Sequence, residues 1–299
     1  NSTKDVNLLT ILDKMPSLKV LDLSNVKLDL FTSLRIRNHL YYYKIIEVLD
    51  LSGTGLNEEM AKEIADGIMK AKALEKIYLM QTNTTKGLSS ILYNLAFQPK
   101  IKLVDISNNS SIDRKETSIA LYKLLKMSQT IETLIFRHIM NFNKELTKDF
   151  YYALGDSNSL VNLDLSFSGN ISNSTLLGKA VAFNALKNGS LKHLAAAEAI
   201  QTYDMFTQFI SGMEVCEADH FTWYGCQFNS NIQKDSTDFY KKTFHCKLQY
   251  LNISKSSMMC YVNINDVKNI KKENPIKNLL SRAKTLETLI MNHISTNKY

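Results

Sequence analysis

The stretch Ile46-Glu-Val-Leu49-Asp-Leu51-Ser-Gly-Thr54-Gly-Leu56 decides the fold of this chain. Its apolar residues follow the spacing LxxLxLxxTxL, in which alternate residues of a short strand face inward before a turn begins. The same phrase recurs along the 299 residues. We place its copies at Leu18, Ile46, Leu74, Ile101, Ile131, Leu160, Leu191, Met213, Leu248 and Leu286. Near-identical four-residue motifs such as Leu21-Asp-Leu-Ser and Leu163-Asp-Leu-Ser show that the pattern does not arise by chance.

The spacing of these copies predicts the domain organisation. Subtraction of the starting numbers gives 28, 28, 27, 30, 29, 31, 22, 35 and 38 residues, so the first seven copies are regular and the last three are not. A solenoid grows by stacking repeats and has no need to split into domains. We therefore expect one domain over 1–299, regular over 1–200 and irregular with insertions over 201–299. Because the pattern starts and stops within a repeat, we also expect a piece of a longer polypeptide.

These motifs resemble the intracellular leucine-rich repeats of the ribonuclease-inhibitor, RanGAP and CARMIL families. The resemblance implies an α/β fold: a right-handed solenoid of about ten repeats, with a parallel β-sheet on the concave side and α-helices on the convex side. The similarity to CARMIL proteins implies a cytoplasmic, cytoskeleton-associated protein. A fold of this kind hosts many functions, so it does not name one.

The segments between the strands predict amphipathic helices. Asn57 can cap a helix that opens with Glu58 and Glu59, whose charges suit the positive end of the helix dipole. Apolar residues at helical spacing predict further helices after Gly87, over about 114–127 and over about 144–154.

Residues that alternate with the inward leucines should line the concave surface. The central column is Asp22, Asp50, Tyr78, Asp105, Ile135, Asp164, Ala195, Glu217, Asn252 and Ile290, and Arg137 lies in the column beside it. Five of these ten central residues are acidic in a chain of net charge +7. One interpretation is an acidic groove that attracts a basic partner. The other is that Asp-Leu-Ser is a recurrent motif of this repeat type and that its carboxylates are simply exposed to water.

Trp223 and Tyr224 lie in an insertion of the eighth copy and also have two interpretations. Trp and Tyr are frequent at the energetic centres of protein interfaces, which favours a binding loop. Alternatively, the aromatic residues of this insertion fill a core disturbed by the short seventh copy.

No pattern in the chain predicts chemistry. The cysteines and histidines near Cys216 and His245 match no zinc-ligand spacing, and we find no Ser-His-Asp order, phosphate-binding glycine loop or HExxH motif. We expect no catalytic residue, cofactor or metal. A basic stretch over 268–284 lacks the interleaved aromatic residues that single-strand nucleic-acid binders use, so nucleic acid is not expected there.

Two functions remain open from the sequence. The first is a non-enzymatic scaffold that binds other proteins with a basic surface inside a larger assembly, with no small-molecule substrate and no transmembrane segment. Its expected binding residues are Asp22, Asp50, Tyr78, Asp105, Arg137, Asp164, Glu217, Trp223 and Tyr224. The alternative is a RanGAP-like activator of a small GTPase, which the shared repeat type implies.

Overall fold

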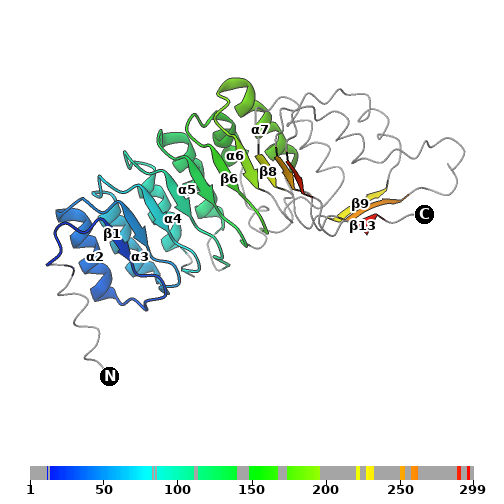
Figure 1. The fold of residues 1–299 in the computed structure, drawn as a ribbon. Helices are drawn as coiled ribbons and strands as arrows, with labels where there is room; N and C mark the ends of the chain where they lie inside the picture. Colours follow the sequence, from blue (N-terminus) through cyan, green and yellow to red (C-terminus); the bar gives the residue numbers. More distant parts are fainter. Residues whose placement is uncertain are drawn as a thin grey trace, which may run out of the picture.

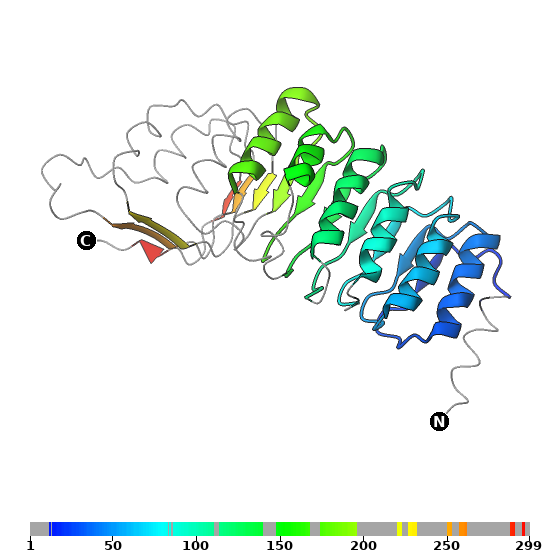
Figure 2. The same ribbon diagram turned by 180° about the vertical axis from the view of Figure 1, so that it is seen from behind.

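The computed structural model is an elongated stack of coils, each made of a short strand, a turn and a return segment (Figure 1). It describes Leu12, residues 14–82, Thr84, and residues 86–110, 114–139, 148–167 and 174–195, together with short strands between 220 and 296. The strands stack side by side and the helices form a second layer on one face of the sheet (Figure 2). This is an α/β leucine-rich-repeat solenoid.

Ten parallel strands form the main sheet in the order β1-β2-β3-β4-β5-β6-β7-β8-β10-β12. Their bounds are Val20–Asp22 (β1), Val48–Asp50 (β2), Lys76–Tyr78 (β3), Leu103–Asp105 (β4), Thr133–Ile135 (β5), Asn162–Asp164 (β6), His193–Ala195 (β7), His220–Thr222 (β8), Tyr250–Asn252 (β10) and Thr288–Ile290 (β12). Ten strands match the number of repeats predicted from the sequence. The sheet face that the helices leave open is the concave face.

Over the described residues up to 195, six helices form the outer, convex layer: α2 (Leu30–Tyr42), α3 (Glu58–Ile68), α4 (Gly87–Leu95), α5 (Arg114–Met127), α6 (Lys148–Asp156) and α7 (Ser174–Lys187). The predicted cap of α3 is confirmed, because Asn57 Oδ1 accepts the Met60 N–H at 2.8 Å. The predicted limits of α5 are also confirmed. The helix predicted from residue 144 is described from Lys148, and 140–147 lie outside the described residues.

The hydrophobic core lies between the two layers and continues from one repeat to the next. In the second repeat, Leu49 and Leu51 point inward from the strand side and Ile64 and Ile68 from α3, all without measurable exposure. The strand contributes every second residue and the helix residues four apart, which are the two natural periods for a single inward face.

The turn after each of the first six strands has a left-handed residue at one fixed position. The fourth residue after the strand's central apolar residue has positive φ in each of the first six repeats: Asn25 (60°), Gly53 (68°), Gln81 (53°), Asn108 (60°), His138 (53°) and Phe167 (61°). Asn and Gly tolerate this conformation, whereas an aromatic residue there is uncommon. The turn is therefore imposed by the stacking of the coils and not by the local residue alone.

The strand register corrects the predicted start of the eighth repeat at Met213. β8 pairs with β7 through Phe221 and Leu194, and with β10 through Phe221 and Leu251. Subtraction of these central residues gives steps of 27 and 30 residues, close to the earlier repeats. The apolar residues Met213 and Cys216 mimic the start of a strand, but the pairing of neighbouring strands selects Phe221.

A second parallel sheet, which the sequence did not predict, accompanies the last three repeats. It has the order β13-β11-β9, with β9 at Gln227–Asn231, β11 at Ser257–Tyr261 and β13 at Ser295–Thr296. Each of these strands begins five residues after the last residue of a strand of the main sheet. Within the described part of the chain, no helix is both long and apolar enough to cross a membrane.

Candidate functional site

The pairing of neighbouring strands aligns the residues of the predicted central column across the concave face. Asp22, Asp50, Tyr78, Asp105, Ile135, Asp164 and Ala195 are successive partners from β1 to β7. The next position belongs to Thr222, which pairs with Ala195, so the placement of Glu217 in this column is wrong. Glu217, Trp223 and Tyr224 themselves lie outside the described residues.

The aspartates of this column hold the turns that follow their own strands. Oδ1 of Asp22, Asp50 and Asp105 accepts the backbone N–H of the residue two positions later at 2.8 to 2.9 Å. Asp164 does the same with Ser166 at 3.0 Å. Aspartate commonly stabilises a turn in this way. The Asp-Leu-Ser motif therefore stabilises the turn of the repeat. Neither interpretation of the column included this structural role for the aspartates.

The environments of these aspartates differ, although their positions are equivalent. Asp22 is exposed, but Asp105 and Asp164 retain only 7% and 9% of their accessible surface. The interpretation in which the carboxylates sit in water is therefore wrong for these two. Burial raises the pKa of Asp105 above its usual range, and the hydrogen bond from Ser107 and the charge of Arg137 oppose that change only in part. The hydrogen bond from Ser24 lowers the pKa of exposed Asp22.

Among the first six repeats, the third and the fifth lack the Asp-x-Ser motif and satisfy the same turn differently. The third repeat has Tyr78 and Met80 at these positions, and the N–H of Met80 donates to Ser52 Oγ of the preceding repeat at 3.2 Å. The fifth repeat has Ile135 and Arg137, and the amide of Arg137 finds an equivalent acceptor in the repeat before it. The turn amide in these repeats no longer depends on the side chain at position 78 or 135. Larger side chains can therefore occupy the concave face there.

Arg137 lies in the middle of the described concave face and pairs with the next repeat. Its Nε donates to Asp164 Oδ2 at 2.5 Å, and a second guanidinium nitrogen also contacts that carboxylate. This hydrogen bond raises the pKa of Arg137. About half of the arginine side chain stays exposed. The guanidinium is thus fixed in direction while part of it faces solvent.

A stacked pair of rings adjoins this arginine. The rings of His138 and Phe167 lie 4.7 Å apart and are inclined by only 6°. Both residues occupy the left-handed turn position, which costs an aromatic residue energy that its surroundings must compensate. Sequence reasoning missed this pair, because the positive φ of these two residues becomes visible only in the folded turn.

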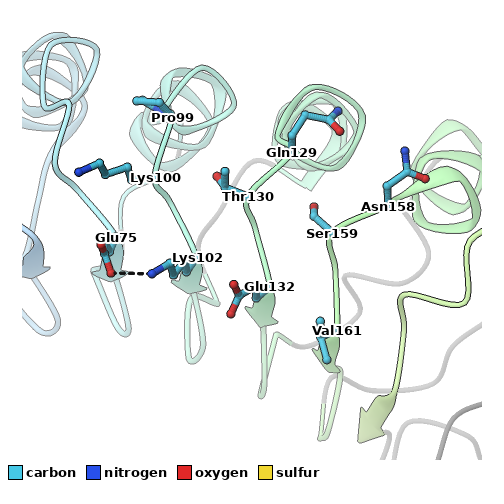
Figure 3. Close-up of a pocket in the computed structure, with 10 residues that line it drawn as sticks. All are labelled: Glu75, Pro99, Lys100, Lys102, Gln129, Thr130, Glu132, Asn158, Ser159 and Val161. Atoms are coloured by element: carbon cyan, nitrogen blue, oxygen red, sulfur yellow. Dashed lines mark hydrogen bonds and ion pairs between the residues drawn. The ribbon is translucent and has the colours of Figure 1, made fainter.

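An open groove of about 580 Å³ runs along the edge of the sheet where the strands begin (Figure 3). Glu75 and Lys102 lie in it and form an ion pair of 3.0 Å across neighbouring repeats. The hydrogen bond between them lowers the pKa of Glu75 and raises that of Lys102. Glu132, Thr130 and Ser159 add further polar groups from the next two repeats. The groove therefore offers charges of both signs and hydroxyl groups to a bound chain.

Charge on the described concave face is slightly negative. Four positions of each repeat contribute to this charge: the two residues before the strand's central apolar residue, and the first and third residues after it. Over the first seven repeats these positions hold seven Asp or Glu and five Lys or Arg, a net of −2 in a chain of +7. The acids are Asp22, Asp50, Asp105, Asp164, Glu47, Glu75 and Glu132, and the bases are Lys19, Lys76, Lys102, Arg137 and Lys192. In the described part of the chain, no three His, Cys, Asp or Glu side chains gather as metal ligands.

Comparisons with known proteins show similarity in structure only. No family model and no curated protein matches the chain. A solved structure titled leiomodin-1 actin-binding site 2 has 18% identity and a TM-score of 0.42 over 52% of this chain and 92% of that one. The tropomodulin C-terminal domain of Caenorhabditis elegans has 13% identity and a TM-score of 0.35 over 63% and 93%. A TLR13 complex with single-stranded RNA has 14% identity and a TM-score of 0.46 over 94% and 36%.

Proposed function

We propose that this chain is a non-enzymatic protein-interaction module that holds a partner with a basic surface on its concave face. The binding centre is formed by Tyr78, Met80, Ile135 and Arg137, with the carboxylates of Asp105 and Asp164 between them. One observation carries the proposal: Ser52 and Ser107 take over the turn hydrogen bonds of the third and fifth repeats. Positions 78 and 135 therefore need no aspartate to hold the turn, and they can carry side chains that bind a partner.

The chemistry of this centre suits a protein surface. Tyr78 and Ile135 flank Asp105 in register, and Ile135 separates it from Asp164. Tyr and Arg are enriched among residues that dominate binding energy, and partly buried carboxylates attract cations more strongly than exposed ones. A lysine or arginine of the partner that reaches Asp105 offsets the cost of burying this carboxylate. The net charge of −2 on this face favours such a partner.

The scaffold role inside a larger assembly and the cytoskeletal association remain predictions from the sequence. Sedimentation of the chain with filamentous actin tests the cytoskeletal association. The alternative role, activation of a small GTPase, predicts faster GTP hydrolysis when the chain is added to a candidate GTPase. An unchanged hydrolysis rate would exclude that alternative for the GTPase tested.

Site-specific photo-crosslinking in cells that express the protein tests the binding centre. A photoreactive amino acid at Ile135 should capture a discrete partner, whereas the same group at Asp66 on α3 should not. The captured protein is then identified by mass spectrometry and measured in solution. Tyr78→Ala and Arg137→Ala should each weaken its binding by about tenfold or more, as residues at an interface centre do.

Val20→Ala is the matched control, because Val20 is exposed on the same sheet face at the first repeat. This variant should bind like the wild type. Equal binding by all three variants, or equal capture from Ile135 and Asp66, would refute the proposed centre. Circular dichroism of each variant checks that the solenoid is intact.

A further inference from the structure

A row of exposed or half-buried side chains crosses the convex face, with one member on each helix. Each member lies two residues after one of the buried residues Ile36, Ile64, Ile91, Leu121, Phe150 and Val181. Two residues along a helix correspond to a rotation of about 200°, so the row points away from the core. Its members are Asn38, Asp66, Tyr93, Lys123, Tyr152 and Phe183.

The character of this row changes between α3 and α4. Asn38 and Asp66 are polar, as expected for the outer surface of a solenoid. From α4 to α7 the row becomes Tyr93, Lys123, Tyr152 and Phe183, here called the convex row. Its three aromatic side chains are 40%, 64% and 50% exposed. Helices pack about 8 to 10 Å apart, so the convex row is about 30 Å long.

Lysines accompany the rings of the convex row. The ammonium group of Lys123 lies 4.2 Å from the centre of the Tyr93 ring, and that of Lys187 lies 5.6 Å from the centre of Phe183. Lys126 lies 5.9 Å from the ring of the neighbouring Tyr122. These distances are within the range of cation–π attraction. The exposed Phe97 adds a further ring, 5.6 Å from Tyr93.

Charge sets a boundary to this surface. Helix α3 carries four acidic residues and one lysine, a net of −3. Helices α4 to α7 together carry seven Lys or Arg and three Asp or Glu, a net of +4. Helix α4 itself carries no charged residue, so the positive charge of this surface lies on α5 to α7, next to Tyr93 of α4. Helix α2, on the other side of α3, carries two arginines and no acidic residue. The helices that carry the convex row form a layer on one side of the sheet, and the concave binding centre belongs to the open face on the other side (Figure 2).

We propose that the convex row is a docking surface for an anionic membrane. Aromatic rings with lysines beside them suit the headgroup region, where the rings enter the apolar boundary and the ammonium groups meet lipid phosphates. Each cation close to an anionic bilayer adds to the attraction. The exposed rings form an outward ridge, whereas protein hot spots fill pockets of their partners. Binding at this surface is peripheral and leaves the concave face open.

Sedimentation of the full chain with lipid vesicles tests the proposal. The chain should sediment with phosphatidylcholine vesicles that contain about one third phosphatidylserine, and not with vesicles of phosphatidylcholine alone. The double variant Tyr152→Ser, Phe183→Ser should weaken binding by about tenfold or more, because each ring loses apolar burial in the bilayer. The double variant Lys123→Glu, Lys126→Glu should weaken it by a similar factor and reduce its dependence on salt.

Met69→Ser is the matched control, because Met69 is 43% exposed on the convex side just after α3 and lies outside the convex row. It should bind vesicles like the wild type. Thermal melting by circular dichroism confirms that each variant is folded. Failure of the folded wild type to bind anionic vesicles, or equal binding by the row variants and the control, would overturn the proposal. Binding to polyglutamate with no binding to vesicles would also overturn it and favour an acidic protein instead.

Discussion

Ser107 Oγ accepts the backbone N–H of Arg137 at 3.1 Å, and so one repeat completes the turn of the next. Ser107→Ala removes this acceptor and should lower the free energy of unfolding by about 1 to 2 kcal/mol. Because the same bond fixes the backbone of Arg137, partner binding should weaken as well. Chemical denaturation measures the first effect. Ser24→Ala is the control and should stay within about 0.5 kcal/mol, because Asp50 already holds the turn amide of the following repeat.

Asp22→Asn should destabilise the protein at neutral pH. The hydrogen bond from Ser24 lowers the pKa of folded Asp22, so its carboxylate stabilises the fold above the unfolded-state pKa. This contribution is lost as the pH falls through the lowered pKa. Denaturation midpoints of wild type and variant should therefore differ at neutral pH and converge in acid. A constant difference across the pH range would contradict this assignment.

Asp105→Asn should have the opposite sign at neutral pH. Burial raises the pKa of folded Asp105, so the folded state binds the proton more tightly and its carboxylate opposes folding above the raised pKa. The amide oxygen of asparagine can still accept the Ser107 N–H. The variant should therefore unfold at a higher denaturant concentration than the wild type at neutral pH. This advantage should shrink as the pH falls and Asp105 becomes protonated; a variant less stable than wild type at neutral pH would refute the argument.

Asn109→Ala should be among the most damaging polar substitutions. Asn109 is fully buried, donates to the carbonyl oxygens of Leu79 (2.8 Å) and Ile106 (2.7 Å), and accepts the Thr82 N–H at 3.0 Å. Its loss leaves several buried groups of two adjacent turns without partners, which should cost about 3 kcal/mol. Lys70→Ala on the exposed surface should stay within about 0.5 kcal/mol. Similar denaturation midpoints for these two variants would contradict the buried role of Asn109.

The left-handed turn position gives a pair of opposite predictions. Gly53→Ala should cost about 1 to 3 kcal/mol, because φ is +68° and the added Cβ would lie 2.5 Å from Asn25 Oδ1. Gln81→Gly at the equivalent position should gain about 0.5 to 1 kcal/mol, since Gln81 is exposed and has a φ of 53°. Thermal unfolding compares both with the wild type. A stabilising Gly53→Ala would show that the turn relaxes more easily than this geometry implies.

Sequence spacing predicted the elements whose signal is local and periodic. Helix α5 was placed correctly because its inward leucines recur with the helical period and a long polar segment precedes it. The start of the eighth repeat was misplaced because Met213 and Cys216 fit the same spacing as Phe221 does. Periodicity alone cannot choose between two such frames, whereas hydrogen bonding to β7 and β10 can.

The sequence by itself determined the solenoid, the order of its strands and, over the first seven repeats, the residues that share the concave column, because each depends on spacing along one chain. Only the tertiary structure decided what those residues do. Asp22 and Asp105 occupy the same position of the repeat motif. Asp22 is nevertheless exposed, whereas Asp105 is buried between Tyr78 and Ile135. Burial among neighbouring repeats raises the pKa of Asp105, whereas exposed Asp22 has its pKa lowered by the hydrogen bond from Ser24, two residues away. Solvent access and electrostatic energy depend on such neighbours, and stacking alone brings them together.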